Sequence, residues 1–114
     1  MIQIFGTKKC KDTQKAIRFF KERNIQIHYV DLQEKAISQG ELNNIRRSVP
    51  LEDLLDREGK EFINRNLKYM KFDIESELLD DPLLFKTPIV RFQQKAAVGY
   101  QPETWKAWAK EIKG

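Results

Sequence analysis

The only cysteine in the chain is the first residue to consider for chemistry. Cys10 follows an apolar run at residues 2–5 and precedes residues 11–23, whose polar and apolar residues have the spacing of an amphipathic helix. Backbone N–H groups in the first turn of a helix lack partners within the helix, and the helix dipole is positive there. The Thr13 hydroxyl and the Lys9 ammonium would add further stabilisation of an anion. The sequence therefore predicts a Cys10 thiol with a lowered pKa, and hence a nucleophilic thiolate.

A purely structural role is the alternative for Cys10. Free cysteines are among the most buried residues and behave as small hydrophobic side chains. On its position alone, Cys10 fits either interpretation. His28 is the only histidine, and one histidine with one cysteine does not make a metal site.

The composition narrows the class of protein. The 114 residues are enough for one domain, which we expect to span residues 1–114. Hydrophobic residues make up 40% and charged residues 33%, and no apolar run approaches the roughly 20 residues of a membrane span. The first residues do not resemble a secretory signal, and a single free thiol suits a reducing compartment, so we expect a cytoplasmic protein. The net charge of +4 comes from intermixed cations and anions, which argues against direct binding of nucleic acid.

The periodicity of the chain predicts an α/β fold. Residues 1–5 and 25–32 have the composition of strands, and with the helix between them they predict a parallel βαβ unit. Residues 38–84 have helical character, beginning with a capping box at Ser38 and Glu41. Residues 88–92 and 95–100 are short and close enough for a β-hairpin, and a last helix follows Pro102. We expect a mixed sheet of about four strands with helices on both faces and a helical insertion at about 38–84.

Three segments together resemble the arsenate reductase (ArsC)/Spx family: GTKKCKDTQKA, LLDREGKEF and KTPIVRFQQKAAVGYQPETW. The resemblance extends over nearly the whole chain and implies a thioredoxin-like fold. It implies that Cys10 is the nucleophile, that no cofactor is bound, and that glutathione or a glutaredoxin is the reductant. Pro88 matches the cis-proline that lies beside the thiol in this fold. Thr87 precedes it, and in thioredoxins the backbone of that residue pairs with an extended thiol substrate.

Two positions depart from the reductases of this family. Glutaredoxin-linked arsenate reductases hold the oxyanion with arginines where this chain has Thr87 and Tyr100. A third family arginine corresponds approximately to Arg57, which is displaced by one residue. Arg91 and Lys86 are the nearest candidate replacements. Because threonine and tyrosine cannot provide the bidentate, permanently charged contacts of arginine, we expect arsenate to be a poor substrate.

Two functions from different classes remain open after this comparison. The first is a thiol-dependent oxidoreductase that acts on a small oxyanion or an oxidised thiol, without a membrane or nucleic-acid partner. The second is an Spx-like regulator that binds RNA polymerase or another protein, which the sequence Val98-Gly99-Tyr100 favours. Spx proteins commonly carry a Cys-x-x-Cys switch, whereas here Thr13 takes the place of the second cysteine. The sequence favours the enzyme, with a site composed of the following residues: Cys10, Lys9, Thr13, Arg57, Thr87, Pro88, Arg91 and Tyr100.

Overall fold

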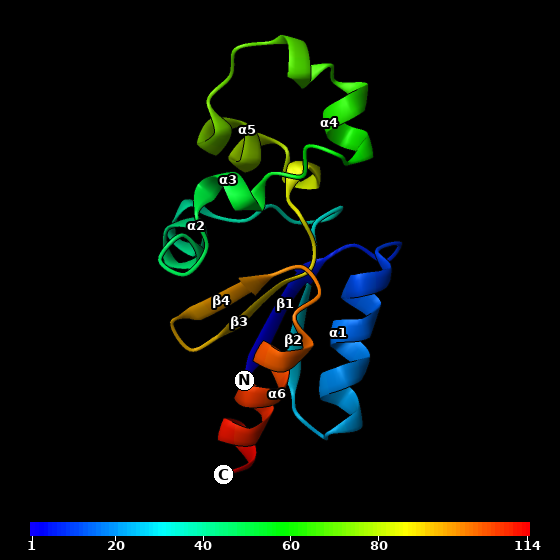
Figure 1. Cartoon of the computed structure of the whole chain (residues 1–114), viewed down its shortest axis with the longest axis vertical. Coiled ribbons are helices and arrows are strands. Elements are labelled where there is room, and N and C mark those ends of the chain that lie inside the picture. Colours follow the sequence, from blue (N-terminus) through cyan, green and yellow to red (C-terminus); the bar gives the residue numbers. More distant parts are fainter.

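A four-stranded mixed sheet forms the centre of the computed structural model, which describes all 114 residues (Figure 1). The strands are β1 (Ile2–Gly6), β2 (Ile27–Asp31), β3 (Ile89–Phe92) and β4 (Lys95–Val98), in the spatial order β2-β1-β3-β4. β1 is parallel to β2 and antiparallel to β3, and β3 and β4 form an antiparallel hairpin. The predicted βαβ unit and hairpin are therefore confirmed.

The second strand is shorter than the predicted 25–32. The amide of Ile25 donates to the carbonyl of Phe20 at 3.0 Å, so Ile25 closes the end of the preceding helix instead of joining the sheet.

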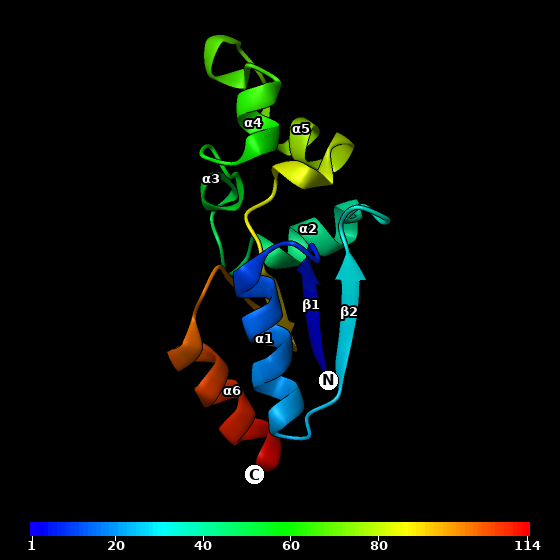
Figure 2. The same ribbon diagram turned by 90° about the vertical axis from the view of Figure 1, so that its right-hand side faces the viewer.

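Two helices of 12 residues cover one face of the sheet. They are α1 (Lys11–Glu22) and α6 (Pro102–Lys113), which lie side by side in Figure 2. α1 buries Ala16 and Phe20 in this layer, and α6 buries Trp105 and Trp108. With Ile2, Ile4, Val90 and Phe92 from the sheet, these residues form one hydrophobic core.

The insertion between β2 and β3 covers the other face of the sheet and extends beyond it. It contains α2 (Gln39–Ile45), α3 (Leu51–Leu54), α4 (Lys60–Asn64) and α5 (Ile74–Asp80), with short 3-10 helices at Leu67–Tyr69 and Pro82–Leu84. The predicted capping box is present, because Ser38 Oγ accepts from the Glu41 amide and Glu41 accepts from the Ser38 amide. The insertion shares a second hydrophobic core with Phe5, Val30 and Ile89 of the sheet.

The order β1-α1-β2, then an insertion, then β3-β4-α6 is that of a thioredoxin-like fold, as the resemblance implied. The insertion makes the molecule long, with extents of 48 × 26 × 23 Å. None of the helices has both the length and the apolar character of a membrane span.

Candidate functional site around Cys10

Cys10 lies where the end of β1 turns into α1. The turn is closed by a hydrogen bond from the Cys10 amide to the Thr7 carbonyl at 3.2 Å. Cys10 itself is the N-cap of the helix, with an extended backbone, and its carbonyl accepts from the Gln14 amide at 3.1 Å. The thiol is half-buried, and its Sγ lies 3.7 Å from the Thr87 carbonyl oxygen, to which it can donate. The predicted position of Cys10 at a helix start is confirmed.

Thr13 lies one helical turn further on, beneath the thiol. The residue is only 1% exposed, and its Oγ1 has no hydrogen-bond partner in the structure, so the hydroxyl is free to donate to Cys10 when the thiol ionises. The last residue of β1 makes this packing possible, because a Cβ atom at Gly6 would overlap the Thr13 side chain. The glycine therefore allows the strand to approach the first turn of α1 closely.

The environment of the thiol stabilises its anion. Burial alone raises the pKa of Cys10, but hydrogen bonds from the Thr13 hydroxyl and the Thr87 side chain act in the opposite direction. The backbone N–H groups of Thr13 and Asp12 add to them, and together these donors hold the pKa of the Cys10 thiol below its usual value. The lowered pKa of Cys10 is thus due to hydrogen bonds from the helix start and from Thr87, and the neighbouring lysines play no comparable part.

The segment just before β3 passes beside the thiol. The Thr87–Pro88 peptide bond is cis, and Pro88 is buried. The Pro88 carbonyl accepts from the Gly99 amide at 2.8 Å, which ties this segment to the end of the hairpin. The Thr87 amide donates to no protein acceptor, and its carbonyl receives only the Cys10 thiol. A free donor and an accessible acceptor of the backbone therefore lie beside the thiol.

Cys10 opens into a cleft of about 440 Å³ between the sheet and the insertion. Its walls come from four parts of the chain that are distant in sequence. The lining residues are Thr7, Lys9, Gln33, Asp56, Gly59, Lys60, Glu61, Pro82, Leu83, Phe85 and Thr87, together with Cys10 itself. The lining includes two cations, Lys9 and Lys60, and two acidic residues, Asp56 and Glu61, so it has no excess of positive charge.

One of these acidic residues, Glu61, has a raised pKa. A hydrogen bond with Asp81 raises the pKa of the Glu61 carboxyl, as do partial burial and the charge of Asp81, while Arg65 acts in the opposite direction. Arg65 is engaged with Asp81 at 2.9 Å and with Glu77 at 2.7 Å. Glu61 therefore holds its proton more strongly than an isolated glutamate.

The structure places Lys9 and Thr87 in the cleft with Cys10, Thr13 beneath the thiol and Pro88 directly after Thr87. It does not bring the other residues that the sequence suggested to the thiol. The Arg57 side chain is exposed, and its guanidinium lies 5.8 Å from the Phe62 ring, outside the cleft. Lys86 is exposed and is not among the lining residues.

Arg91 and Tyr100 also lie elsewhere. Arg91 donates to Gln3 at 2.8 Å and to Asn44 at 3.0 Å, so it joins β1 to α2 on the second face of the sheet. Tyr100 is 51% exposed, and its ring packs edge-on against Trp105 at a centroid distance of 5.4 Å.

The insertion supplies cleft residues that the sequence analysis did not single out. Asp56, Gly59, Lys60 and Glu61 all come from the DREGKE segment before and within α4. Asp56 accepts from the Glu58 amide at 3.2 Å and lies so close to Gly59 that a Cβ there would overlap its carboxylate. The sequence Asp-x-x-Gly is a turn signal, but it does not indicate which part of the fold the turn faces.

Comparisons with known proteins agree with this arrangement. A family model described as "ArsC family" matches residues 5–108. No curated protein matches the chain.

Solved structures of similar shape include three whose lengths match closely. The YFFB (PA3664) protein has a TM-score of 0.82 and 19% identity, over 96% of this chain and 99% of its own. A putative ArsC family related protein from Bacteroides fragilis has a TM-score of 0.78 and 21% identity, over 94% and 96% of the two chains. An arsenate reductase from Vibrio cholerae has a TM-score of 0.78 and 17% identity, again over 94% and 96%. At such identities the likeness establishes a shared fold.

Proposed function

This chain belongs to the ArsC family, and we propose that it is a single-cysteine thiol oxidoreductase whose Cys10 forms a mixed disulfide with glutathione or a glutaredoxin. The family includes thiol-dependent reductases, and a structural neighbour from Vibrio cholerae is described as an arsenate reductase. The proposal rests mainly on one observation in this chain. An activated thiol lies beside a backbone N–H and C=O of Thr87 that no other backbone group occupies.

The geometry suits thiol–disulfide exchange with an extended peptide. The Cys10 thiolate would attack one sulfur of oxidised glutathione, forming a Cys10–glutathione disulfide and releasing the second glutathione as a thiolate. The backbone of the bound cysteine can pair with Thr87 as a strand residue would, which holds its sulfur in line with Cys10. A second thiol then attacks the glutathione sulfur and restores the Cys10 thiolate. Because the chain has no other cysteine, this resolving thiol must come from another molecule.

The cleft is less suited to arsenate itself. A divalent oxyanion requires an excess of positive charge, whereas here Lys9 and Lys60 are offset by Asp56 and Glu61. A charge-assisted contact contributes about 1.5–3 kcal/mol, so the loss of the arginine at position 87 alone would weaken oxyanion binding by about tenfold or more. Oxidised thiols, which are bound through backbone contacts, are the better class of substrate for this site.

The experiment is to incubate the protein with oxidised glutathione and to measure the mixed disulfide by intact mass spectrometry. We expect one glutathione per chain, faster formation as the pH rises through the lowered pKa of Cys10, and release by reduced glutathione or a glutaredoxin. Cys10→Ser is the control and should acquire no adduct. Arsenate reduction, coupled to oxidation of glutathione, should be weak or undetectable.

A regulatory role is the second candidate, and the exposed Tyr100 at the end of the hairpin is the observation that favours it. An Spx-like protein would bind RNA polymerase or another protein through its surface and would not need turnover. If the protein forms no mixed disulfide and reduces no substrate, the oxidoreductase proposal fails and this second function is favoured.

A further inference from the structure

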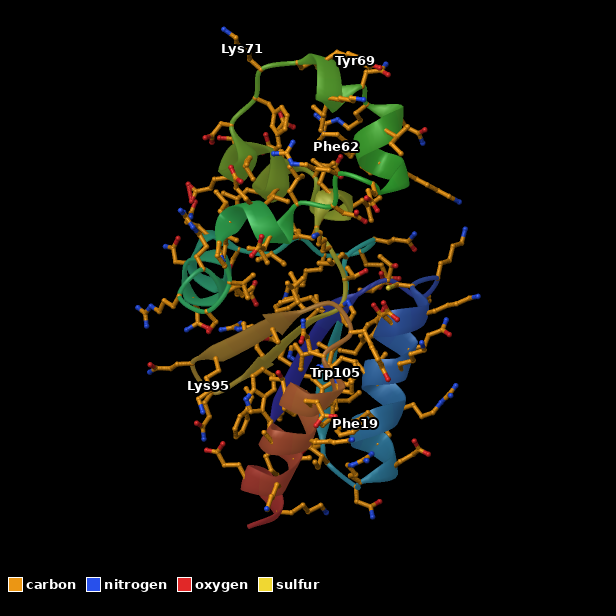
Figure 3. The ribbon with its side chains drawn as sticks, viewed as in Figure 1. Phe19, Phe62, Tyr69, Lys71, Lys95 and Trp105 are labelled. Atoms are coloured by element: carbon orange, nitrogen blue, oxygen red, sulfur yellow. The ribbon has the colours of Figure 1, made fainter.

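A groove that the thiol chemistry does not use runs between α1 and α6. It consists of two adjoining hollows of about 230 and 380 Å³ that share Arg23. The helices that form it lie next to one another in Figure 2, and Figure 3 shows Phe19 and Trp105 between them. We call it the α1–α6 groove. Cys10 is not among its lining residues.

The positive charge of the protein is concentrated in this layer. Residues 11–23 and 102–113, which are the two helices with Arg23, hold eight of the 21 Lys and Arg residues but only four of the 17 Asp and Glu residues. The layer therefore carries a charge of +4, whereas the remainder of the chain has no net charge. Six cations line the groove itself: Lys15, Arg18, Arg23, Lys106, Lys110 and Lys113.

Most of these cations are available to a partner. Only two of them make ion pairs, Lys15 with Asp12 and Lys106 with Glu103, and both partners lie within the same helix at exposed positions. Surface pairs of this kind are weak, so they do not neutralise the groove. Arg18, Lys110 and Lys113 have no acidic partner in the structure.

The floor and rim of the groove are aromatic. The Arg23 guanidinium lies 3.6 Å from the Phe19 ring centroid and donates to the Phe19 carbonyl at 2.9 Å, so its position is fixed before any partner arrives. Lys15 Nζ lies 4.9 Å from the centre of the half-exposed Tyr100 ring. Oriented arginine and exposed tyrosine are the residues that protein–protein interfaces use most.

We propose that the α1–α6 groove binds an acidic polypeptide segment of another protein. The groove contains one carboxylate, Glu22, which makes no ion pair. A phosphodiester backbone offers only acceptors and would be repelled by Glu22, whereas a peptide backbone can donate an N–H to it while its acidic side chains reach the surrounding cations. The carboxylate of Glu22 among the cations therefore favours a polypeptide over a nucleic acid.

The test uses a fluorescein-labelled peptide of Asp, Glu and Leu residues and measures its binding to the full chain by fluorescence anisotropy. We expect binding that weakens as salt rises from about 0.05 to 0.15 M. The double variant Arg18→Glu with Lys110→Glu should bind at least about tenfold more weakly, since attraction is replaced by repulsion at the rim.

The matched control is Lys68→Glu with Lys71→Glu, which changes the net charge by the same amount. Both lysines are exposed in the insertion, and Figure 3 shows Lys71 at the far end of the molecule from α6. This variant should retain wild-type affinity within about twofold. Circular dichroism checks the fold of each variant, and Arg18→Gln with Lys110→Gln replaces the reversal if that variant unfolds.

Three results would overturn the proposal. Absence of peptide binding would show that the groove is only a solvated surface. Equal weakening by the two charge reversals would show attraction to net charge instead of to the groove. Tighter binding of a single-stranded DNA of equal charge would assign the surface to nucleic acid.

Discussion

Replacing Thr13 by valine tests the proposed origin of the Cys10 thiolate. The change removes one hydroxyl beneath the thiol and nearly preserves the volume of a side chain that is 1% exposed. A hydrogen bond to a charged group contributes about 1.5–3 kcal/mol, and the lower end applies because Cys10 is half-exposed. Since about 1.4 kcal/mol is a factor of ten, the acid dissociation constant of the thiol should fall about tenfold.

The assay is the rate of alkylation by iodoacetamide as a function of pH. In Thr13→Val the midpoint should move toward that of a free cysteine, and the rate near neutral pH should fall about tenfold. Thr13→Ser keeps the hydroxyl and should retain the wild-type midpoint. A valine variant with an unchanged midpoint would refute the role of the Thr13 hydroxyl.

Stability provides an independent readout of the same change. The pKa of Cys10 is lower in the folded chain than in the unfolded chain, so folding gains stability as pH rises between the two pKa values. This gain is complete above the unfolded pKa and is lost as pH falls through the folded pKa. Thr13→Val should show a smaller rise in unfolding free energy over that interval. At pH values below this interval Thr13→Val should be no less stable than the wild type, because Thr13 Oγ1 has no hydrogen-bond partner in the structure.

Three further substitutions separate the cleft from its surroundings. Thr87→Arg should raise arsenate binding at least about tenfold, measured as protection of Cys10 from alkylation. Tyr100→Arg should not raise it, because residue 100 lies outside the cleft. Stronger protection in Tyr100→Arg than in Thr87→Arg would show that residue 100 reaches the anion. Arg91→Leu should lower the free energy of unfolding by about 2 kcal/mol in urea because two hydrogen bonds are lost, and an altered Cys10 alkylation rate would contradict its placement outside the site. Gly6→Ala should cost about 1–3 kcal/mol in thermal unfolding because its Cβ would overlap Thr13, and an unchanged melting temperature would argue against that close packing.

Local patterns of the sequence were sufficient to predict the sheet and the position of the Cys10 thiol. The apolar run before Gly6 and the amphipathic spacing after Cys10 depend on neighbouring residues, so they predicted the strand, the helix and the position of Cys10 between them. The hairpin was predictable for the same reason. A pattern of this kind requires no knowledge of distant segments.

The surroundings of the thiol depend on contacts between distant segments, and there the sequence was less informative. Arg91 looks like a solvent-facing residue on a short strand, but its partner Asn44 lies 47 residues away, on α2. Lys60 reaches the cleft only because hydrophobic packing orients the insertion over the sheet. Gly99 has a φ of +83°, a conformation suited to glycine, at the point where the chain leaves the hairpin for α6, and Tyr100 then packs on Trp105.

The two hydrophobic cores on opposite faces of the sheet separate the residues that support the thiolate from the residues that form the outer wall of the cleft. The groups that stabilise the Cys10 thiolate belong to α1 and to the Thr87–Pro88 segment. Asp56, Lys60 and Glu61 of the cleft wall belong to the insertion. Substitutions in the insertion can therefore change what enters the cleft while the thiolate remains intact. Homologues with this fold can therefore differ in substrate through substitutions in the insertion, while Cys10 and the hydrogen bonds that stabilise its thiolate are retained.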